Sequence, residues 1–198
     1  MKFILASSNP HKAEEFSLLF ENSLEVIPAP HAIDVDESGV SFQENAFLKA
    51  QSYFKKFKVP TLADDSGLML DAFPELLGVQ SARFAPELPN YYDKNQKLLE
   101  LYREKDKADR GASFVCVLCF YLSDDEVYFF EGRMKGEIAQ TISGEHGFGY
   151  DPIFIPEDKD VSVAEIPEWK NEFSHRARAV KNALSFFKEN MDKTQNKL

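Results

Sequence analysis

Residues 112–122 read ASFVCVLCFYL, and after the link Ser123–Asp125 residues 126–138 read EVYFFEGRMKGEI. Both runs are rich in apolar, β-branched and aromatic residues, which indicates two strands, and the short polar link predicts a hairpin. Earlier in the chain, helices and strands are expected to alternate. The predicted fold class is therefore mixed α/β (α+β), with a partly antiparallel sheet and helices packed against it.

The two cysteines, Cys116 and Cys119, lie inside the first of these runs and form a C-x-x-C pair. Residues three apart in a strand point to opposite faces, so the two sulfur atoms are expected to diverge. The sequence has no second cysteine pair and no histidine pair at zinc-ligand spacing. We therefore expect buried structural thiols.

Shorter strands are expected on either side of the hairpin. They are residues 2–6, 25–30 and 59–63, with a sheet-edge strand in residues 148–156. The strand at residues 59–63 is expected to end at the neighbouring carboxylates Asp64 and Asp65.

Four helices are indicated by apolar periodicity and capping residues. They start after Asn9 with Pro10 in the first turn, cover residues 41–57 and 91–105, and start again after Ser174. Ser41 and Glu44 match a capping box, which accounts for Glu44 without a catalytic role. Residues from about 191 to 198 are expected to be a frayed tail.

Composition limits the possible partners. The chain has 198 residues, 43% hydrophobic residues including 18 Phe, and a formal charge of −10. This supports a sizeable core in a single domain over residues 1–198, with room for a small second lobe. The negative charge disfavours a nucleic-acid polymer or an anionic membrane as partner. No apolar run is long enough to span a membrane, so a cytoplasmic protein is expected.

The stretch LADDSGL, residues 62–68, places two like charges side by side in an already acidic chain. A solvated turn, a backbone cap and a cation site are the possible explanations. Strand alternation points the two carboxylates apart, so one of them is expected to face a site.

Two helix starts carry bases where acids are electrostatically preferred. His11 and Lys12 open the first helix, and His175 and Arg176 follow Ser174 at the last. Either these bases pair with surface acids, which contributes little, or the two helix starts hold an anion.

Together these residues match the needs of a triphosphate. Mg²⁺ binds one or two carboxylates together with phosphate oxygens, and Asp64, Asp65 and the loop residue Glu37 are candidate ligands. Lys12, Lys170 and Arg176 would neutralise the remaining phosphate charge.

Six segments carry a resemblance to a known family. They are SSNPHKAEEF (7–16), SFQENAFLKA (41–50), LADDSGL (62–68), GVQSARFA (78–85), GEHGFGYDPIF (144–154) and KNEFSHRARA (170–179). In this order they resemble the inosine triphosphate pyrophosphatases, the dITP/XTP pyrophosphatases that remove deaminated purine nucleotides. The resemblance spans residue 3 to about residue 187.

The resemblance implies an elongated sheet, a cleft between two lobes, and a homodimer. It implies Mg²⁺-dependent hydrolysis of dITP, ITP or XTP to the nucleoside monophosphate and pyrophosphate. By position, Asp65 is the implied catalytic residue, and Asp65 and Glu37 are the implied metal ligands. The implied substrate contacts are Ser7, Ser8, Asn9, Lys12, Ser66, Phe148, Gly149, Tyr150, Asp151, Lys170, His175 and Arg176.

Some points stay open at this stage. Ser8, Leu77 and Gln80 depart from the family pattern, which puts loop shape in doubt but removes no charged position. Phe148 or Tyr150 is expected to stack on a purine, unless both fill the core. The alternative functions are a Maf-type pyrophosphatase acting on other nucleotides and a nucleotide-binding module without catalysis.

Overall fold

The computed structural model describes residues 2–21, 23–105 and 109–195, and the side chains of these residues up to Asn190. Its elements, in chain order, are β1 (Lys2–Leu5), α1 (Pro10–Leu19), β2 (Glu25–Pro28), α2 (Phe42–Phe57), β3 (Thr61–Leu70), the 3-10 helix η1 (Gly78–Arg83), α3 (Tyr91–Glu104), β4 (Gly111–Ser123), β5 (Glu126–Ile138), the 3-10 helix η2 (Asp151–Ile153), β6 (Phe154–Pro156), the 3-10 helix η3 (Val163–Glu165), α4 (Pro167–Phe173) and α5 (His175–Gln195).

The described strands form one mixed sheet in the order β2-β1-β3-β4-β5-β6. β1 is parallel to β2 and to β3, whereas β6 is antiparallel to β5 at the edge. The two-residue link between β4 and β5 makes them the expected hairpin. The predicted mixed α/β class is confirmed.

The chain divides into two compact units. Unit 1 comprises residues 1–65, 116–132 and 175–198, and unit 2 comprises residues 66–115 and 133–174. β3, β4 and β5 each contribute residues to both units.

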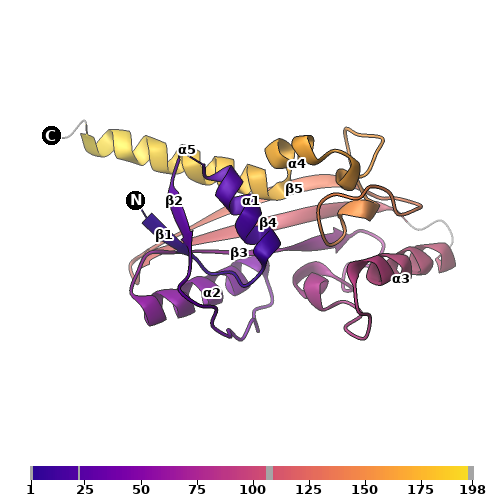
Figure 1. Cartoon of the computed structure of the whole chain (residues 1–198), viewed down its shortest axis with the longest axis horizontal. Coiled ribbons are helices and arrows are strands. Elements are labelled where there is room, and N and C mark those ends of the chain that lie inside the picture. Colours follow the sequence, from indigo (N-terminus) through magenta and orange to yellow (C-terminus); the bar gives the residue numbers. More distant parts are fainter. Residues whose placement is uncertain (1, 22, 106–108, 196–198) are drawn as a thin grey trace. The chain divides into compact units, whose positions relative to one another are not determined.

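Unit 1 has helices on both faces of its strands (Figure 1). On one face α1 and α5 pack over Phe3, Leu5 and the even-numbered residues of β4. On the other face α2 packs over Ile4, Ala6 and the odd-numbered residues Cys119 and Tyr121 of β4. β1 and β4 are apolar on both faces because both of their faces are covered.

The alternation in β4 confirms the prediction for the cysteines. Cys116 belongs to the α1–α5 core, Cys119 belongs to the α2 core, and both are buried free thiols. Burial raises the pKa of each thiol to about 12.

Gly132 allows α5 to approach β5 closely. A Cβ at this position would lie 2.1 Å from the carbonyl oxygen of His175 and 2.4 Å from the backbone nitrogen of Ala179. Any side chain here would push the first turn of α5 away, so Gly132 helps to place the residues that open this helix.

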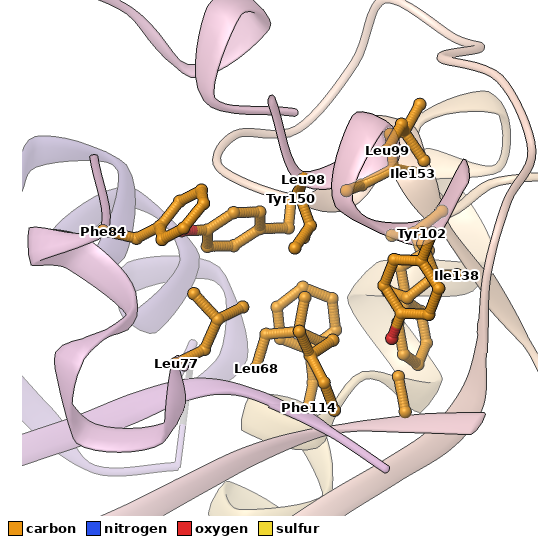
Figure 2. Close-up of a cluster of buried hydrophobic side chains, with 14 of the residues drawn as sticks. Leu68, Leu77, Phe84, Leu98, Leu99, Tyr102, Phe114, Ile138, Tyr150 and Ile153 are labelled. Carbon is orange, nitrogen blue, oxygen red and sulfur yellow. The ribbon is translucent and has the colours of Figure 1, made fainter. Parts of the chain in front are cut away.

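Unit 2 has its own core, built from α3, η2, β6, η3, the residues that flank η1, and the unit's parts of β3, β4 and β5. Figure 2 shows Leu68, Phe114 and Ile138 of the strands facing Leu98 and Tyr102 of α3. The nonpolar area buried in this cluster is the main source of its stability.

Three details differ from the sequence predictions. The strand expected to end at the acidic pair runs on to Leu70, because the buried carboxylates have cationic partners and do not break it. The helix α4 was not predicted; it is short and starts at Pro167. Residues 78–85, expected as loop, contain η1.

The helix ends are close to the predictions. Asn9 caps α1, with Pro10 as its first residue. At α2 the Ser41 side chain accepts from the Glu44 N–H, but the Glu44 carboxylate accepts from the N–H of Val40, one residue before the capping-box position. α5 continues to Gln195, and residues 196–198 of the expected tail lie outside the described residues.

Candidate active site

The two acidic residues of LADDSGL open onto opposite faces of β3 in unit 1. Leu62 belongs to the core under α1 and α5, and Ala63 belongs to the core under α2. Alternation continues this pattern, so Asp64 reaches residues of α1 and α5, whereas Asp65 reaches residues of α2. The expected divergence of the two carboxylates is confirmed.

Asp64 lies within a buried group of charges. Its carboxylate is 2.9 Å from the Lys12 ammonium and 3.4 Å from the Arg176 guanidinium. Arg176 also pairs with Glu15 of α1 and lies over the ring of Phe16, with 1% of the residue exposed. Of the two explanations for bases at helix starts, pairing with acids therefore applies to Lys12 and Arg176, although Asp64 is a buried acid and Glu15 a half-buried one.

These contacts shift the protonation equilibrium of Asp64. Burial alone would raise the pKa of this carboxyl group, but the positive charges of Lys12 and Arg176 lower it well below its usual range. Asp64 is therefore charged at neutral pH, and its cationic neighbours hold it in place.

Asp65 is bound by two side chains of α2. Its carboxylate is 3.1 Å from the Lys49 ammonium and 3.3 Å from the Asn45 amide nitrogen. Lys49 is also 3.2 Å from Glu37 in the loop before α2. Asp65 and Glu37 thus converge on the same cationic group, although they come from different segments.

Burial raises the pKa of Asp65 above its ordinary value, and it outweighs the attraction of Lys49 and Lys12. Burial would lower the pKa of Lys49, but the carboxylates of Asp65, Asp64 and Glu37 raise it overall. Lys49 is therefore cationic at neutral pH.

The start of α1 presents the polar segment Ser7–Asn9. The Asn9 side chain accepts hydrogen bonds from the backbone N–H groups of His11 and Lys12, at 3.0 and 3.3 Å. Ser7 accepts from the Asn9 N–H at 3.2 Å, and Ser8 is exposed. Asn9 therefore occupies the first donors of the helix, so an anion here would meet mainly the side chains and the positive end of the helix dipole.

Unit 2 holds a second polar cluster, in the segment GFGYD. The Asp151 carboxylate accepts from the Phe148 N–H and from the Lys170 ammonium, both at 2.8 Å. The Lys170 nitrogen lies 4.7 Å from the centre of the Phe148 ring. Asp151 and Lys170 are buried, so this ion pair fixes the backbone and the ring of Phe148 together.

The aromatic residues of this segment have different environments. Tyr150 is buried in the core of unit 2 and donates from its hydroxyl to the Ser81 carbonyl at 2.7 Å, whereas Phe148 is half-buried (Figure 2 shows Tyr150). Gly147 packs against Asp151, because a Cβ there would lie 2.2 Å from the carboxylate, and its φ is +77°.

The other predicted site residues are distributed between the two units. Ser66, half-buried, follows Asp65 in the chain and is the first residue of unit 2. His175 is buried at the start of α5 in unit 1. Within unit 1 the structure therefore brings Lys12, Asp64 and Arg176 together on one face of β3. On the other face of β3, Asp65 and Glu37 both contact Lys49.

Lys49, Asn45 and Glu15 were missed by the sequence analysis. Asn45 and Lys49 are one helical turn apart inside SFQENAFLKA, and their spacing places both on one face of α2. Asn45 and Lys49 are polar residues on an otherwise apolar face of this helix, and that pattern could have identified them as site residues.

The carboxylates of this site could hold a hard divalent cation only if a bound ligand supplied further oxygen atoms. The described residues contain no group of three or more His, Cys, Asp or Glu side chains arranged to hold a metal. Asp65 and Glu37 are two oxygen donors, which matches the one or two carboxylates that Mg²⁺ takes when phosphate oxygens and water complete its shell. No described helix is long and apolar enough to cross a membrane.

Comparison with known proteins identifies the family of the chain. The model of the Ham1 family matches residues 3–186. A dITP/XTP pyrophosphatase of Oceanobacillus iheyensis is 40% identical, over 90% of this chain and 94% of the relative. One from Malacoplasma penetrans is 38% identical, over 96% and 99%.

Solved structures give the same result. The Ham1 protein of Staphylococcus aureus has a TM-score of 0.83 and 36% identity, over 96% of this chain and 100% of that one. A HAM1 protein from Coxiella burnetii has a TM-score of 0.84 and 36% identity, over 96% and 99%. The resemblance drawn from the six sequence segments is confirmed, and the chain belongs to the Ham1 family.

Proposed function

We propose that the protein hydrolyses deaminated purine nucleoside triphosphates, dITP, ITP and XTP, to the nucleoside monophosphate and pyrophosphate. Relatives that match nearly the whole chain carry the name dITP/XTP pyrophosphatase. One structural observation carries the proposal. The carboxylates of Asp65 and Glu37 both contact the Lys49 ammonium, next to the Lys12–Asp64 pair.

The triphosphate is assigned to the start of α1, in contact with Ser7, Ser8, Asn9 and Lys12. The N-terminus of a helix favours negative charge, and Lys12 lies in the first turn of α1. Because Arg176 also neutralises Asp64, the Lys12 ammonium can turn to a phosphate without leaving Asp64 as a buried, uncompensated charge.

Mg²⁺ is the proposed cofactor, with Asp65 and Glu37 as its protein ligands. Two carboxylates from separate segments that share one cationic neighbour support this assignment. When bound, the ion would neutralise phosphate charge and polarise the phosphoryl group.

Asp65 is proposed as the catalytic residue, which orients and deprotonates the attacking water. In-line attack at the α-phosphorus expels pyrophosphate, and Lys12 stabilises the charge that develops on the leaving group. Asn45 and Lys49 hold the Asp65 carboxylate in one orientation, so they act through Asp65.

The nucleoside is assigned to Ser66, Phe148, Gly149, Tyr150, Asp151, Lys170, His175 and Arg176. Hypoxanthine and xanthine present a keto oxygen at C6, whereas adenine presents an amino group there. A pocket of donors would satisfy the keto form and leave donors facing donors with adenine, at a cost of about 1–3 kcal/mol for each unpaired group.

We also infer that the chain acts as a single domain over residues 1–198, as a homodimer, and in the cytoplasm. Light scattering coupled to size-exclusion chromatography measures the mass in solution. A mass of one chain at micromolar concentration would refute the homodimer.

The test of function is pyrophosphate release from a panel of nucleotides, with and without Mg²⁺. We expect turnover of dITP and XTP only with the metal, near-complete loss in Asp65→Asn, and wild-type rates in Asp125→Asn, a control at an exposed position of the β4–β5 link. Faster hydrolysis of dTTP or UTP would favour the Maf-type alternative. Binding without pyrophosphate release would favour a nucleotide-binding module.

A further inference from the structure

Asn95 is a buried polar residue in the apolar core of unit 2. It lies on α3 next to Leu98 and Leu99, with 1% of the residue exposed. Its amide nitrogen donates to the carbonyl oxygen of Gly149 at 3.1 Å, which joins segments 54 positions apart in the sequence. α3 is thereby tied to the segment GFGYD.

The other half of the Asn95 amide carries an energetic cost. Its oxygen is buried, and no described residue donates a hydrogen bond to it. An unsatisfied buried acceptor costs about 1–3 kcal/mol, which leucine, of similar shape, would not incur. Asn95 is therefore a poor choice for stability alone, and such exceptions concentrate at functional positions.

The partner of Asn95 is the carbonyl next to Phe148. Gly149 has a φ of +68°, so the chain turns sharply between Phe148 and Tyr150. Tyr150 is anchored in the core through Ser81, and Asp151 holds the Phe148 N–H. The hydrogen bond from Asn95 fixes the peptide group between these two anchors.

Neighbouring contacts make α3 a firm support. Lys94 donates to the Ala82 carbonyl of η1 at 3.3 Å, so the same turn of α3 holds a second segment. Leu98 and Leu99 of the next turn are buried in the core. A hydrogen bond from this helix therefore limits rotation of the Gly149 peptide, and with it the direction of the Phe148 ring.

We propose that Asn95 is a positioning residue for the nucleoside part of the substrate. By holding the Gly149 carbonyl, it keeps the half-buried Phe148 ring in the orientation that accepts a purine. The inference rests on the proposed function, since it assigns the nucleoside to this segment.

The test uses the full-length chain with Asn95→Leu, which keeps the shape and removes the donor. Asn182→Leu is the matched control, because the Asn182 amide also donates to a backbone carbonyl, that of Glu131 at 2.9 Å, on an exposed part of α5. Five quantities are measured for each variant: KM and kcat for dITP, the inhibition constants of dIMP and pyrophosphate, and the melting temperature.

We expect KM for dITP and the dIMP inhibition constant to rise about tenfold in Asn95→Leu, the effect of losing one hydrogen bond. The pyrophosphate inhibition constant and kcat should stay within about twofold, because pyrophosphate has no base to be positioned. The melting temperature should not fall as KM rises. The Asn182→Leu control should match wild type throughout.

Two results would overturn the inference. One is an unchanged dIMP inhibition constant, and the other is a parallel rise in the pyrophosphate constant, which indicates general damage. If Asn95→Leu does not fold, Asn95→Ser is measured in the same way. As a second readout, hydrogen exchange at the Phe148 and Asp151 amides should quicken, and unchanged exchange refutes the positioning role.

Failure of the proposed function is separately visible. Wild-type protein that releases no pyrophosphate from dITP would refute the pyrophosphatase assignment without using any Asn95 variant. In that case the dIMP affinities of wild type and Asn95→Leu still decide whether Asn95 positions a purine nucleotide. Equal affinities, or no binding of dIMP, would refute it.

Discussion

Removal of Arg176 tests whether the buried charges around Asp64 hold unit 1 together. Lys12, Arg176, Glu15 and Asp64 carry two positive and two negative charges, and the two residues that pair most deeply, Arg176 and Asp64, are each 1% exposed. Arg176→Met removes one positive charge and leaves the group with a net negative charge. Breaking a buried ion pair from one side costs about 3–5 kcal/mol, so we expect a loss of that size in the free energy of unfolding.

The double variant separates charge balance from packing. Asp64→Asn alone leaves a net positive group, whereas Arg176→Met with Asp64→Asn leaves Lys12 and Glu15, and neutrality is restored. The double variant should therefore lose less than the sum of the two single losses, by about 1–3 kcal/mol. Urea unfolding followed by circular dichroism at pH 7 gives each free energy, and an unchanged slope keeps the comparison valid.

Two outcomes would refute this reasoning. If Arg176→Met costs less than about 1 kcal/mol, the guanidinium behaves like a surface charge, contrary to its burial. If the two losses are additive, Asp64 and Arg176 are not energetically coupled. In either case the ion pairs of Arg176 would not be what holds unit 1 together.

Three further changes have definite expected outcomes. Lys49→Met removes the ammonium group that Asp65 and Glu37 share, so the melting temperature should fall without metal and recover with millimolar Mg²⁺. No recovery would count against the metal site. Burial raises the thiol pKa of Cys116 and Cys119 to about 12, against about 8.5 in the unfolded chain. Both thiols should therefore resist Ellman's reagent at pH 8 until the protein unfolds. The free energy of unfolding should fall as the pH rises from about 8.5 to about 12, because the unfolded chain loses the thiol protons first. Rapid labelling of the native protein would contradict their burial. Gly147→Ala would bring a Cβ within 2.2 Å of a carboxylate oxygen at positive φ, so KM for dITP should rise, and an unchanged KM would argue against this segment as the nucleoside site.

Local pattern was enough to predict most of the elements. The β4–β5 hairpin, the Asn9 cap and the divergence of Cys116 and Cys119 all depend on neighbours in sequence, and all are present in the structure. The end of β3 was predicted wrongly because charge in a strand is normally a sign of its end. Here distant residues compensate the charge, and no local pattern contains that information.

The residues of the candidate site were predictable from the sequence only where a local motif or charge pattern marked them. Asp65, Glu37 and Lys12 came from motif and charge, but Lys49 was missed because its importance lies in the two carboxylates it touches, 12 and 16 positions away. The burial of Arg176 was missed for the same reason. A base at a helix start is normally solvated, and only the folded chain brings Glu15 and Asp64 to it.

The difference between the two adjacent carboxylates explains why the divalent ion is assigned to only one of them. Asp64 has two cationic partners, Lys12 and Arg176, so it stays compensated when Lys12 turns to a phosphate. Asp65 and Glu37 share Lys49, and movement of that ammonium toward a phosphate would leave two carboxylates close together with less compensation. Like charges in a partly buried site repel strongly, and a divalent ion relieves that repulsion. We infer that a metal held by Asp65 and Glu37 binds cooperatively with a triphosphate held by Lys12, and that Asp64 serves to hold Lys12.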